Sequence, residues 1–557
     1  MFDRHFKVWP RRTARHLSVP ETTLPYNLEV SARRFPDRAA IVYYGRELSY
    51  ADLHDQVERL AGYLQHSLGV AKGERVLLYM QNSPQFMIGY YAILRADAVV
   101  VPVNPMNRTT EMEHFVADTG ARVALLGQEL FPVIQPLLGK GGLQHAVVAN
   151  YAEYADPAFD LPVPDAAKAP TRTDLGADLG TGAVLWRDAL AAGETAAPST
   201  AAPDDWAVFP YSSGTTGNPK GCIHTHRTVM TTMLATIVWS PMSADSTHLV
   251  TLPLFHVTGM QTAMNAPIYM GGTMVVMTRW DRRTAALLIE RYRVARWRSI
   301  TTMAIDFVND PEIRTVDLSS LETIGGGGAA MPEVIADRLR DLTGLDYIEG
   351  YGLSETIAST HINPIDNPKR QCLGIPIFDV DSRVIAVEDG RELPPGEVGE
   401  IVIHGPQVFK GYWNDPKGTA DAFMELDGKR FFRTGDLGYY DEDGYFFIVD
   451  RVKRMINASG FKVWPTEVEG LMLRHPAIAE VCIIASPDPR RGETVKACVV
   501  LRESHRDAVT EQDIIAWCRD NMAAYKCPSK VEIRDALPRS ATGKLQWREL
   551  QDKEKGL

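Results

Sequence analysis

The sequence predicts an α/β protein with a large N-terminal domain of layered sheets and helices, and a small α+β C-terminal domain on a hinge. In the first half, strand-like runs such as "AAIVYY" and "ERVLLYM" alternate with segments of helical spacing such as "YADLHDQVERLAGYLQHSL". This alternation is typical of parallel strands joined by crossover helices. Beyond about residue 450 the pattern changes to a short mixed set of helices and strands that ends near Leu550. A chain of 557 residues is long enough for more than one core.

Further segments extend the pattern. The runs "AVVVPVN" and "ARVALLG" are strand-like, and a second unit begins near Leu321. There a strand leads into the glycines of "ETIGGGGAA", a helix follows in "MPEVIADRLRDLTG", with Pro332 near its start and Gly344 at its end, and "DYIEGYG" is the next strand. Loops after such strands are where α/β sheets bind ligands.

These patterns give predicted boundaries. The change of pattern places a domain boundary at about residue 450, so the N-terminal domain covers residues 1–449. Residues 156–205 are rich in Ala, Pro, Thr and Asp, which predicts a long surface loop.

Composition excludes several classes of protein. The net charge of -11 argues against nucleic-acid binding, which requires clustered Lys and Arg. The six cysteines lack zinc-site spacing and are interpreted as packing thiols in a reducing compartment. No apolar run is long enough to span a bilayer, so we expect a cytoplasmic protein. A peripheral membrane contact and a homodimer are left open.

One loop carries the first chemical signal. "YSSGTTGNPKG", residues 211–221, combines glycines that let backbone amides approach a ligand with hydroxyl donors and the cation of Lys220. Such a loop suits a polyphosphate. The Walker pattern fails here, because Pro219 stands where a glycine is needed and Gly221 follows the lysine. The loop therefore predicts phosphate binding without predicting a P-loop NTPase.

Other motifs follow this loop in a fixed order. They are "LPLFH", "GYGLSET", "TGD", "DRVKRMINASGFKVWPTEVE" and "SATGK". Together with "YSSGTTGNPKG", they make nearly the whole chain resemble the adenylate-forming superfamily, which includes acyl-CoA synthetases, luciferases and the adenylation domains of peptide synthetases. The resemblance is strongest to fatty-acid and other acyl-CoA synthetases.

The resemblance implies an activity. A carboxylate is a poor electrophile, so AMP is first transferred to it from ATP, and the resulting anhydride then reacts with a thiol. We therefore expect an ATP-dependent, AMP-forming acyl-CoA synthetase that uses ATP, Mg²⁺ and coenzyme A and acts on a medium- to long-chain aliphatic acid. An aryl- or alicyclic-acid CoA ligase and a stand-alone enzyme that loads a carrier protein remain the alternatives.

The resemblance also implies roles around ATP. Ser354 would contact the α-phosphate, and Glu355 would take the magnesium ion, because hard cations prefer carboxylate and phosphate oxygens. Asp436 would accept the ribose hydroxyls with support from Arg451, and Tyr351 would stack on adenine. The β- and γ-phosphates would be held by Ser212, Ser213, Gly214, Thr215, Thr216, Gly217 and Lys220. The rest of the ATP site would comprise Gly328, Ala329, Ala330, Glu349, Gly350 and Gly352.

The resemblance also implies roles for further residues in the two half-reactions. Lys544 would stabilise charge between carboxylate and α-phosphate during adenylation. The resemblance further implies a hinge at residues 450–455 that contains Lys453, on which a mobile C-terminal domain, residues 456–557, would rotate before thioester formation. Coenzyme A would meet Ser459, Gly460 and Arg279, and His256 would help to open the carboxylate site.

The choice of acid is predicted from less specific features. Small glycines in "GGGGAAM" and flexible methionines in "HVTGMQTAMNAPIYMGG" suggest an apolar acyl tunnel. Met260 stands where some long-chain enzymes of this superfamily carry a gating tryptophan, and Asp306 departs from the usual pattern before the pocket helix.

Overall fold

The fold was analysed in a computed structural model of the chain. It describes residues 3–170, 182–212, 219–328, 330–451, 454–458, 461–488, 492–506, 508–539 and 545–556. Among these residues, no helix has the length and apolar character needed to cross a bilayer. All six cysteines are buried free thiols, which is consistent with the prediction that they are packing thiols.

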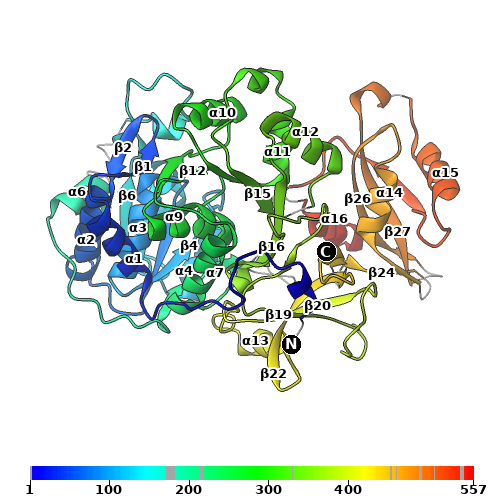
Figure 1. The fold of residues 1–557 in the computed structure, drawn as a ribbon, viewed down its shortest axis with the longest axis horizontal. Helices are drawn as coiled ribbons and strands as arrows, with labels where there is room; N and C mark the ends of the chain where they lie inside the picture. Colours follow the sequence, from blue (N-terminus) through cyan, green and yellow to red (C-terminus); the bar gives the residue numbers. More distant parts are fainter. Residues whose placement is uncertain are drawn as a thin grey trace. The chain divides into compact units, whose positions relative to one another are not determined.

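Two mainly parallel sheets form the N-terminal part of the molecule (Figure 1). The first has seven strands in the order β11-β8-β4-β3-β5-β6-β7, and its pairs are parallel except β8 with β11. The strands are β3 (Arg75–Tyr79), β4 (Val99–Pro102), β5 (Val123–Gly127), β6 (His145–Ala149), β7 (Ala183–Leu185), β8 (Trp206–Val208) and β11 (His224–Thr225).

The second sheet has nine strands in the order β18-β17-β16-β15-β14-β12-β13-β1-β2. Its six central strands are parallel, and antiparallel strands complete both edges. The strands are β1 (Ala39–Tyr43), β2 (Arg46–Ser49), β12 (Thr247–Val250), β13 (Thr273–Val276), β14 (Arg296–Ser299), β15 (Thr323–Gly327), β16 (Tyr347–Leu353), β17 (Ala358–Ile362) and β18 (Ile375–Pro376).

Helices cover both faces of each sheet, so the strands are apolar on both sides. In β3, Val76 and Leu78 enter the core between the two sheets, while Leu77 and Tyr79 pack on the outer side. The helices between the sheets are α1 (Leu24–Arg34), α2 (Tyr50–His66), α3 (Pro84–Arg95), α7 (His226–Trp239) and α9 (Ala266–Met270). The outer helices are α4 (Thr109–Thr119) and α5 (Phe131–Ile134) on the first sheet, and α10 (Arg282–Arg291), α11 (Thr301–Val308) and α12 (Glu333–Thr343) on the second.

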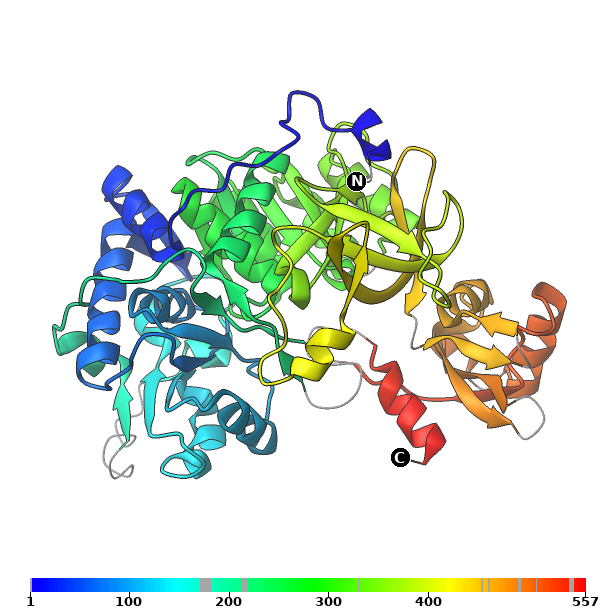
Figure 2. The ribbon, with the colours of Figure 1, turned by 90° about the horizontal axis from the view of Figure 1, so that it is seen from below.

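Two smaller sheets follow. One is antiparallel, with strands β19 (Asp381–Ile385), β20 (Gly399–His404), β21 (Phe423–Leu426), β22 (Lys429–Tyr440) and β23 (Phe446–Arg451), and helix α13 (Pro416–Asp421) precedes β21. The other contains β24 (Ile456–Ala458), β25 (Phe461–Val463), β26 (Ile478–Asp488), β27 (Gly492–Leu501) and β28 (Lys530–Ile533). Helices α14 (Pro465–Met472) and α15 (Glu511–Asn521) pack on one face of this last sheet, and α16 (Trp547–Lys555) packs on the other (Figure 2).

The predicted fold class is confirmed, because both sheets and the small C-terminal set of elements form as expected. The chain divides into two compact units. Unit 1 comprises Met1–Asp381 and His404–Phe432, and unit 2 comprises Ser382–Ile403 and Arg433–Leu557. Unit 2 thus includes residues upstream of the predicted boundary at 450. The predicted hinge at 450–455 stays a prediction, since residues 452 and 453 lie outside the described residues.

Residues 156–205 are not simply a surface loop. Strand β7 pairs with β6 at the edge of the seven-stranded sheet, and helix α6 (Trp186–Ala191) follows it directly. Trp186 is completely buried in the core between the sheets. The Ala- and Pro-rich composition concealed this short strand and helix, because only Trp186 and its neighbours provide an apolar anchor. The predicted surface loop is therefore wrong for residues 183–191.

Candidate functional site

The predicted phosphate loop is framed by described residues. Its first strand is β9 (Tyr211–Ser212) and its last is β10 (Lys220–Gly221), and the two pair as an antiparallel hairpin. Helix α4 contacts both ends of the loop: the Tyr211 hydroxyl donates to Asp118 Oδ2 at 2.5 Å, and His114 Nε2 lies 3.1 Å from the Pro219 carbonyl oxygen. One rigid helix therefore fixes where the loop begins and ends. The loop residues Ser213, Gly214, Thr215, Thr216 and Gly217 lie outside the described residues.

Lys220 does have a described side chain. Its ammonium lies 2.5 Å from Asp415 Oδ2 and 5.2 Å from the centre of the Tyr412 ring. The cation is about two-thirds buried, which strengthens both contacts relative to open water.

Glu355 lies on a tight turn at the carboxyl end of β16, in the 3-10 helix η9 (Ser354–Thr356). The side chain is largely buried. Its Oε1 accepts a hydrogen bond of 2.9 Å from the Tyr412 hydroxyl, and its backbone carbonyl accepts one of 2.8 Å from the Phe409 amide. Three neighbouring groups thus fix this turn, because His224 Nε2 also donates to the Ser354 carbonyl at 2.8 Å.

The strand that begins the phosphate loop, β9, lies next to the Glu355 turn. Strand β9 contacts η9, and Cys222 lies close to both Ser212 and Glu355. Burial, together with the Glu355 carboxylate, raises the pKa of the Cys222 thiol. Burial also lowers the pKa of His224 to about 3, so the imidazole is neutral when its Nε2–H donates to the Ser354 carbonyl.

The donor set at this turn fits a magnesium ion held jointly with a nucleotide. In the described part of the chain, no three His, Cys, Asp or Glu side chains cluster as a metal site made by protein alone. Magnesium in nucleotide enzymes is bound by one or two carboxylates together with substrate phosphates. A single fixed carboxylate at Glu355, close to a phosphate-type loop, matches that pattern.

The predicted adenine site lies at the ends of two neighbouring parallel strands. Strand β15 runs into Gly328, whose φ is +91°, and β16 contains Gly350, Tyr351 and Gly352. A side chain at Gly327 would place its Cβ 2.3 Å from the Gly350 carbonyl oxygen. Glycine is needed there because the two backbones approach so closely. Ala330 is exposed just beyond Gly328, and Ala329 lies outside the described residues.

Two side chains shape this region. Glu349 is buried and accepts from the Met331 amide at 2.8 Å and from the Cys372 amide at 3.4 Å, and burial raises the pKa of its carboxyl. These contacts hold the backbone that follows Ala330. The ring of Tyr351 is largely buried and lies 5.6 Å from the ring of His361, its register partner on β17.

Asp436 and Arg451 belong to unit 2 and face each other across paired strands. They are register partners on β22 and β23, and Arg451 Nε lies 2.9 Å from Asp436 Oδ1. The carboxylate is buried, while the arginine is about half exposed. The pairing gives Asp436 the support that the sequence led us to expect from Arg451.

The remaining predicted residues are less well defined by contacts. His256 is half-buried and caps the short helix α8 (Val257–Gly259), its Nδ1 accepting from the Thr258 amide at 3.4 Å. Arg279 is exposed just after β13. Lys453, Ser459, Gly460 and Lys544 lie outside the described residues, so their roles stay predictions.

Two methionines of the predicted acyl lining lie in the core of the protein. Met260 and Met264 lie on the π-helical turn η7 (Met260–Asn265) and are completely buried in the core between the sheets. These methionines are therefore core residues in this structure, and they do not support the predicted acyl tunnel.

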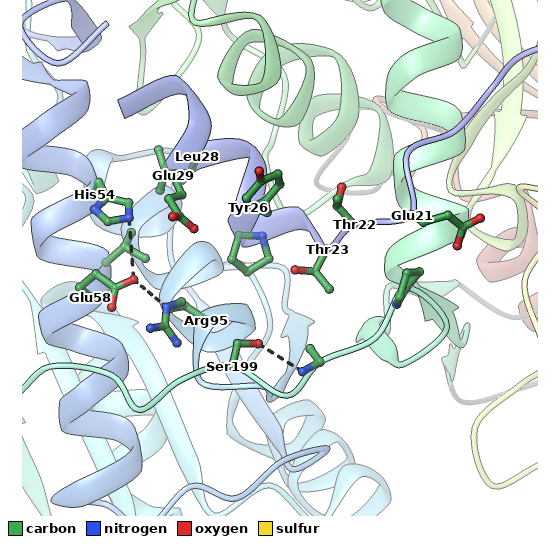
Figure 3. Close-up of a pocket in the computed structure, with 14 residues that line it drawn as sticks. Glu21, Thr22, Thr23, Tyr26, Leu28, Glu29, His54, Glu58, Arg95 and Ser199 are labelled. Carbon is green, nitrogen blue, oxygen red and sulfur yellow. Dashed lines mark hydrogen bonds and ion pairs between the residues drawn. The ribbon is translucent and has the colours of Figure 1, made fainter. Parts of the chain in front are cut away.

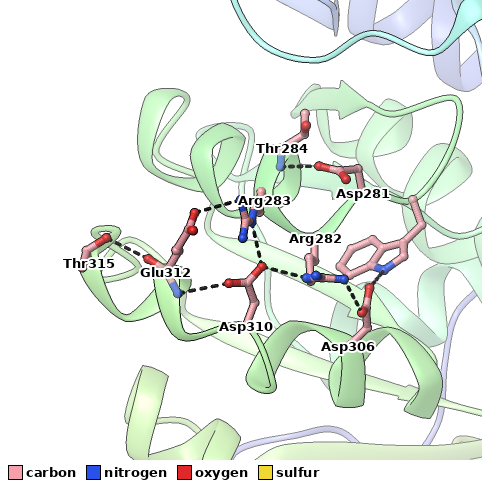
Figure 4. A network of polar contacts seen from close by, with 9 residues as sticks. Asp281, Arg282, Arg283, Thr284, Asp306, Asp310, Glu312 and Thr315 are labelled. Atoms are coloured by element: carbon pink, nitrogen blue, oxygen red, sulfur yellow. Dashed lines mark hydrogen bonds and ion pairs between the residues drawn. The ribbon is translucent and has the colours of Figure 1, made fainter.

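Asp306, which departs from the usual pattern, has a structural explanation (Figure 4). Its carboxylate accepts from the Trp280 indole at 2.8 Å and from Arg282 at 2.8 Å. Arg282 also contacts Asp310 at 2.7 Å, and this network joins α10 to α11. Asp306 therefore braces two helices.

A pocket of about 440 Å³ is lined by none of the predicted site residues (Figure 3). Its charged groups already contact one another or their neighbours: Glu58 accepts from Arg95 at 2.6 Å, and His54 lies 3.8 Å from Glu58. It is lined by Glu21, Thr22, Thr23, Pro25, Tyr26, Leu28, Glu29, His54, Val57, Glu58, Arg95, Ser199, Ala201 and Pro203. Nothing in this lining corresponds to a predicted motif.

The sequence analysis missed several residues that shape the site, namely His114, Asp118, His224, Tyr412 and Asp415. His224 follows the phosphate loop closely in "KGCIHTH" and could have been noticed there. Tyr412 and Asp415 lie in "FKGYWNDPKG", almost two hundred residues after the loop, and no local pattern links the two segments. Only the fold brings them together.

Comparison with known proteins defines the class. Residues 28–413 match the family model described as AMP-binding enzyme, and residues 467–544 match the model described as AMP-binding enzyme C-terminal domain. Together with the layered sheets and the phosphate-type loop, these matches mean that the chain belongs to the AMP-binding enzyme family, within the adenylate-forming superfamily. The predicted family is confirmed.

Individual relatives cover almost the whole chain. A long-chain-fatty-acid–CoA ligase of Bacillus subtilis is 34% identical over 98% of this chain and 97% of its own length. A feruloyl-CoA synthase of an Amycolatopsis species is 33% identical over 92% of this chain and 95% of its own. The crystal structure of ATP-bound MatB from Rhodopseudomonas palustris superposes with a TM-score of 0.81 at 27% identity, covering 96% of this chain and 99% of that chain.

Proposed function

We propose that this protein is an ATP-dependent, AMP-forming acyl-CoA synthetase that activates a medium- to long-chain aliphatic carboxylic acid as an acyl-adenylate and transfers it to coenzyme A. The ligase class is supported by the family match and by relatives of that class along the full chain. The observation that carries the proposal for this site is that Lys220 and Glu355 both contact Tyr412. The predicted phosphate-binding cation and the predicted metal-binding carboxylate thus share one neighbour, which supports the proposal that both bind one triphosphate.

In the first half-reaction, the loop 212–220 would hold the β- and γ-phosphates through backbone amides, hydroxyls and Lys220. Ser354 would donate to the α-phosphate. Glu355 would hold the magnesium ion, which neutralises phosphate charge when bound. These roles are supported by the contact between strand β9, where the loop begins, and the fixed Glu355 turn.

The nucleoside would bind where the glycine-rich ends of β15 and β16 leave room for a flat base. Gly328, Ala329, Ala330, Gly350 and Gly352 would form its walls, Tyr351 would stack on adenine, and Glu349 would hold the backbone of one wall through the Met331 amide. Asp436, supported by Arg451, would accept the ribose hydroxyls.

Lys544 would stabilise the charge that develops at the α-phosphate, and it would leave the site when the C-terminal domain turns about Lys453. Ser459, Gly460 and Arg279 would then meet coenzyme A, and His256 would help to open the site for the acid. The family resemblance supports these roles.

An aliphatic chain is proposed because of the long-chain-fatty-acid–CoA ligase relative. The feruloyl-CoA synthase relative supports the alternative, an aromatic acid, at nearly the same identity. Loading of a carrier protein remains the third alternative.

Pyrophosphate exchange over a panel of carboxylic acids tests the proposal. We expect exchange with medium- to long-chain aliphatic acids, and AMP release that depends on coenzyme A. Exchange with cinnamic acids alone would support the aromatic alternative. The absence of exchange with every acid would refute the proposed acyl-CoA synthetase activity.

We also propose a cytoplasmic location, supported by six buried cysteines that form no disulfide. Cell fractionation tests it. A homodimer and a peripheral membrane contact stay predictions, and light scattering and vesicle sedimentation test them.

A further inference from the structure

A segment distant in sequence joins the phosphate loop to the Glu355 turn. We call residues 409–418 the brace. Its backbone follows the strand that leaves the phosphate loop: the Lys410 amide donates to the Ile223 carbonyl at 2.9 Å, and the Trp413 amide donates to the Gly221 carbonyl at 2.8 Å. At its first residue, the Phe409 amide donates to the Glu355 carbonyl at 2.8 Å. The brace is thereby fixed to both parts of the predicted triphosphate site.

The outer end of the brace is fixed to helix α4. Trp413 Nε1 and the Asn414 side-chain amide both donate to the Asp118 carbonyl, at 2.8 and 2.9 Å. The Asp118 carboxylate accepts from Tyr211 at the start of the phosphate loop. The same helix end therefore sets the position of the brace and of the loop.

Tyr412 is the first of two brace side chains that face the site. Its hydroxyl donates to Glu355 Oε1 at 2.9 Å, and the Lys220 ammonium lies 5.2 Å from its ring centre. The phenol is part-buried, which makes the hydrogen bond to a carboxylate stronger than in water. This bond fixes which way the Glu355 carboxylate is turned.

Asp415 is the second brace side chain that faces the site. One carboxylate oxygen, Oδ1, accepts from the Gly418 amide at 2.7 Å and caps helix α13, while Oδ2 lies 2.5 Å from Lys220 Nζ. A Cβ added at Gly418 would lie 2.7 Å from that Nζ. The same Cβ would lie 2.1 Å from Asp415 Oδ2, so glycine at position 418 leaves room for the Asp415–Lys220 ion pair.

We propose that Tyr412 and Asp415 are positioning residues for the triphosphate: Tyr412 orients the Glu355 carboxylate toward the metal ion, and Asp415 holds the Lys220 ammonium in place for the phosphates. An ammonium has three N–H donors, so one bond to Asp415 leaves donors for phosphate oxygens. The inference rests on the proposed roles of Glu355 and Lys220.

The test uses direct binding to the full-length protein. Mn²⁺ replaces Mg²⁺, and bound Mn²⁺ is measured by electron paramagnetic resonance with ATP present and no acid. ATP binding without metal is measured separately by calorimetry in EDTA. Tyr412→Phe should weaken Mn²⁺ binding about three- to tenfold, as expected for one hydrogen bond, with metal-free ATP binding unchanged. Asp415→Ser should weaken metal-free ATP binding by a similar factor or more, with Mn²⁺ binding changed less.

Serine is chosen at position 415 because it still caps a helix N-terminus, so a role in capping alone predicts no change. The matched controls are Tyr26→Phe and Asp421→Asn, which alter an exposed phenol and an exposed carboxylate outside the brace contacts. Thermal unfolding of each variant shows whether it is folded.

Double variants decide whether the two residues act through their partners. Tyr412→Phe should add nothing to Glu355→Gln, and Asp415→Ser should add nothing to Lys220→Ala. Full additivity would overturn the inference, as would unchanged binding in folded single variants. If Glu355→Gln and Lys220→Ala themselves leave Mn²⁺ and ATP binding unchanged, the proposed function of those two residues fails first, and the inference fails with it.

Discussion

Buried histidines link the stability of this protein to pH. His224, His248 and His361 are almost completely buried, and burial lowers the pKa of each to about 3. In the unfolded chain the same imidazoles titrate near 6.5. Below pH 6.5 the unfolded chain therefore takes up protons that the folded chain does not, and the free energy of unfolding falls. The stabilising contribution is complete above pH 6.5 and is lost as the pH falls toward 3.

His248 offers a single-residue test of this linkage. It lies on β12, and burial is the main cause of its lowered pKa, with Arg296 second. We expect His248→Leu to make the free energy of unfolding less dependent on pH between 6.5 and 5 by up to about 1.4 kcal/mol per pH unit, the value of one proton. Urea unfolding at several pH values measures this slope. His505→Gln, at a partly exposed position, is the control, and equal slopes for His248→Leu and the unchanged protein would contradict the expectation.

At the residue scale, the sequence predicts site residues that lie in motifs better than it predicts the residues that hold them in place. Glu355 and Lys220 can be identified because each lies in a contiguous motif. Their partners Tyr412 and Asp415 cannot, since a hydrogen bond between residues 57 positions apart leaves no local pattern. Asp306 shows the converse: it was noticed as unusual, but its contacts with Trp280 and Arg282 are structural.

At the scale of elements, strand β15 shows how glycines serve the site. A Cβ at Gly326 would lie 1.8 Å from the Ser299 carbonyl oxygen and 2.4 Å from the Tyr347 hydroxyl. The strand is therefore packed against its neighbour β14 more closely than any other residue type permits. Because β15 and β16 end at the predicted adenine site, displacing β15 would change that site as well as the sheet.

Gly326→Ala is predicted to lower the free energy of unfolding by about 1–3 kcal/mol, as overpacking does. It should also raise the KM for ATP, because the end of β15 moves. Gly470→Ala is the matched control: Gly470 lies in helix α14 with no atom within 4 Å of an added Cβ, so no loss of stability is expected. Thermal unfolding and ATP saturation curves check both variants. If Gly326→Ala leaves both the free energy of unfolding and the KM for ATP unchanged, the close packing of β15 does not matter as described.

Periodicity predicted several of the regular elements. Strands β1, β3, β4, β5, β15 and β16 and helices α2 and α12 form where the alternation of apolar residues indicated them. Strand β7 and helix α6 were missed, because the surrounding Ala- and Pro-rich composition outweighs a signal of nine residues. The π-helical turn at 260–265 was also missed, since its methionines have the same apolar character in a helix, a π-turn or a pocket wall.

At the scale of the whole molecule, the order of motifs along the chain predicted the family, and the family matches cover both parts of the chain. Predicted site residues lie in both compact units, with Lys220 and Glu355 in unit 1 and Asp436 and Arg451 in unit 2. The residues predicted to act in the two half-reactions are therefore divided between the two units.

The predicted hinge has its own test. Proline at position 453 fixes φ near −65° and removes an N–H, so it restricts rotation of the backbone. We expect Lys453→Pro to slow thioester formation from acyl-adenylate and coenzyme A while adenylation is retained. Rapid-quench measurement follows the two half-reactions separately. An unchanged rate of thioester formation would contradict the predicted hinge.

The most direct test of the central claim, that one chain uses different residues for two half-reactions, is Lys544→Ala assayed in each half-reaction separately. The account predicts that acid-dependent pyrophosphate exchange falls by about 100- to 1000-fold or more, the cost of removing one charge-stabilising contact in a transition state. It also predicts that supplied acyl-adenylate is still converted to the thioester with coenzyme A at a rate near that of the unchanged protein. An equal loss in both half-reactions would contradict the claim.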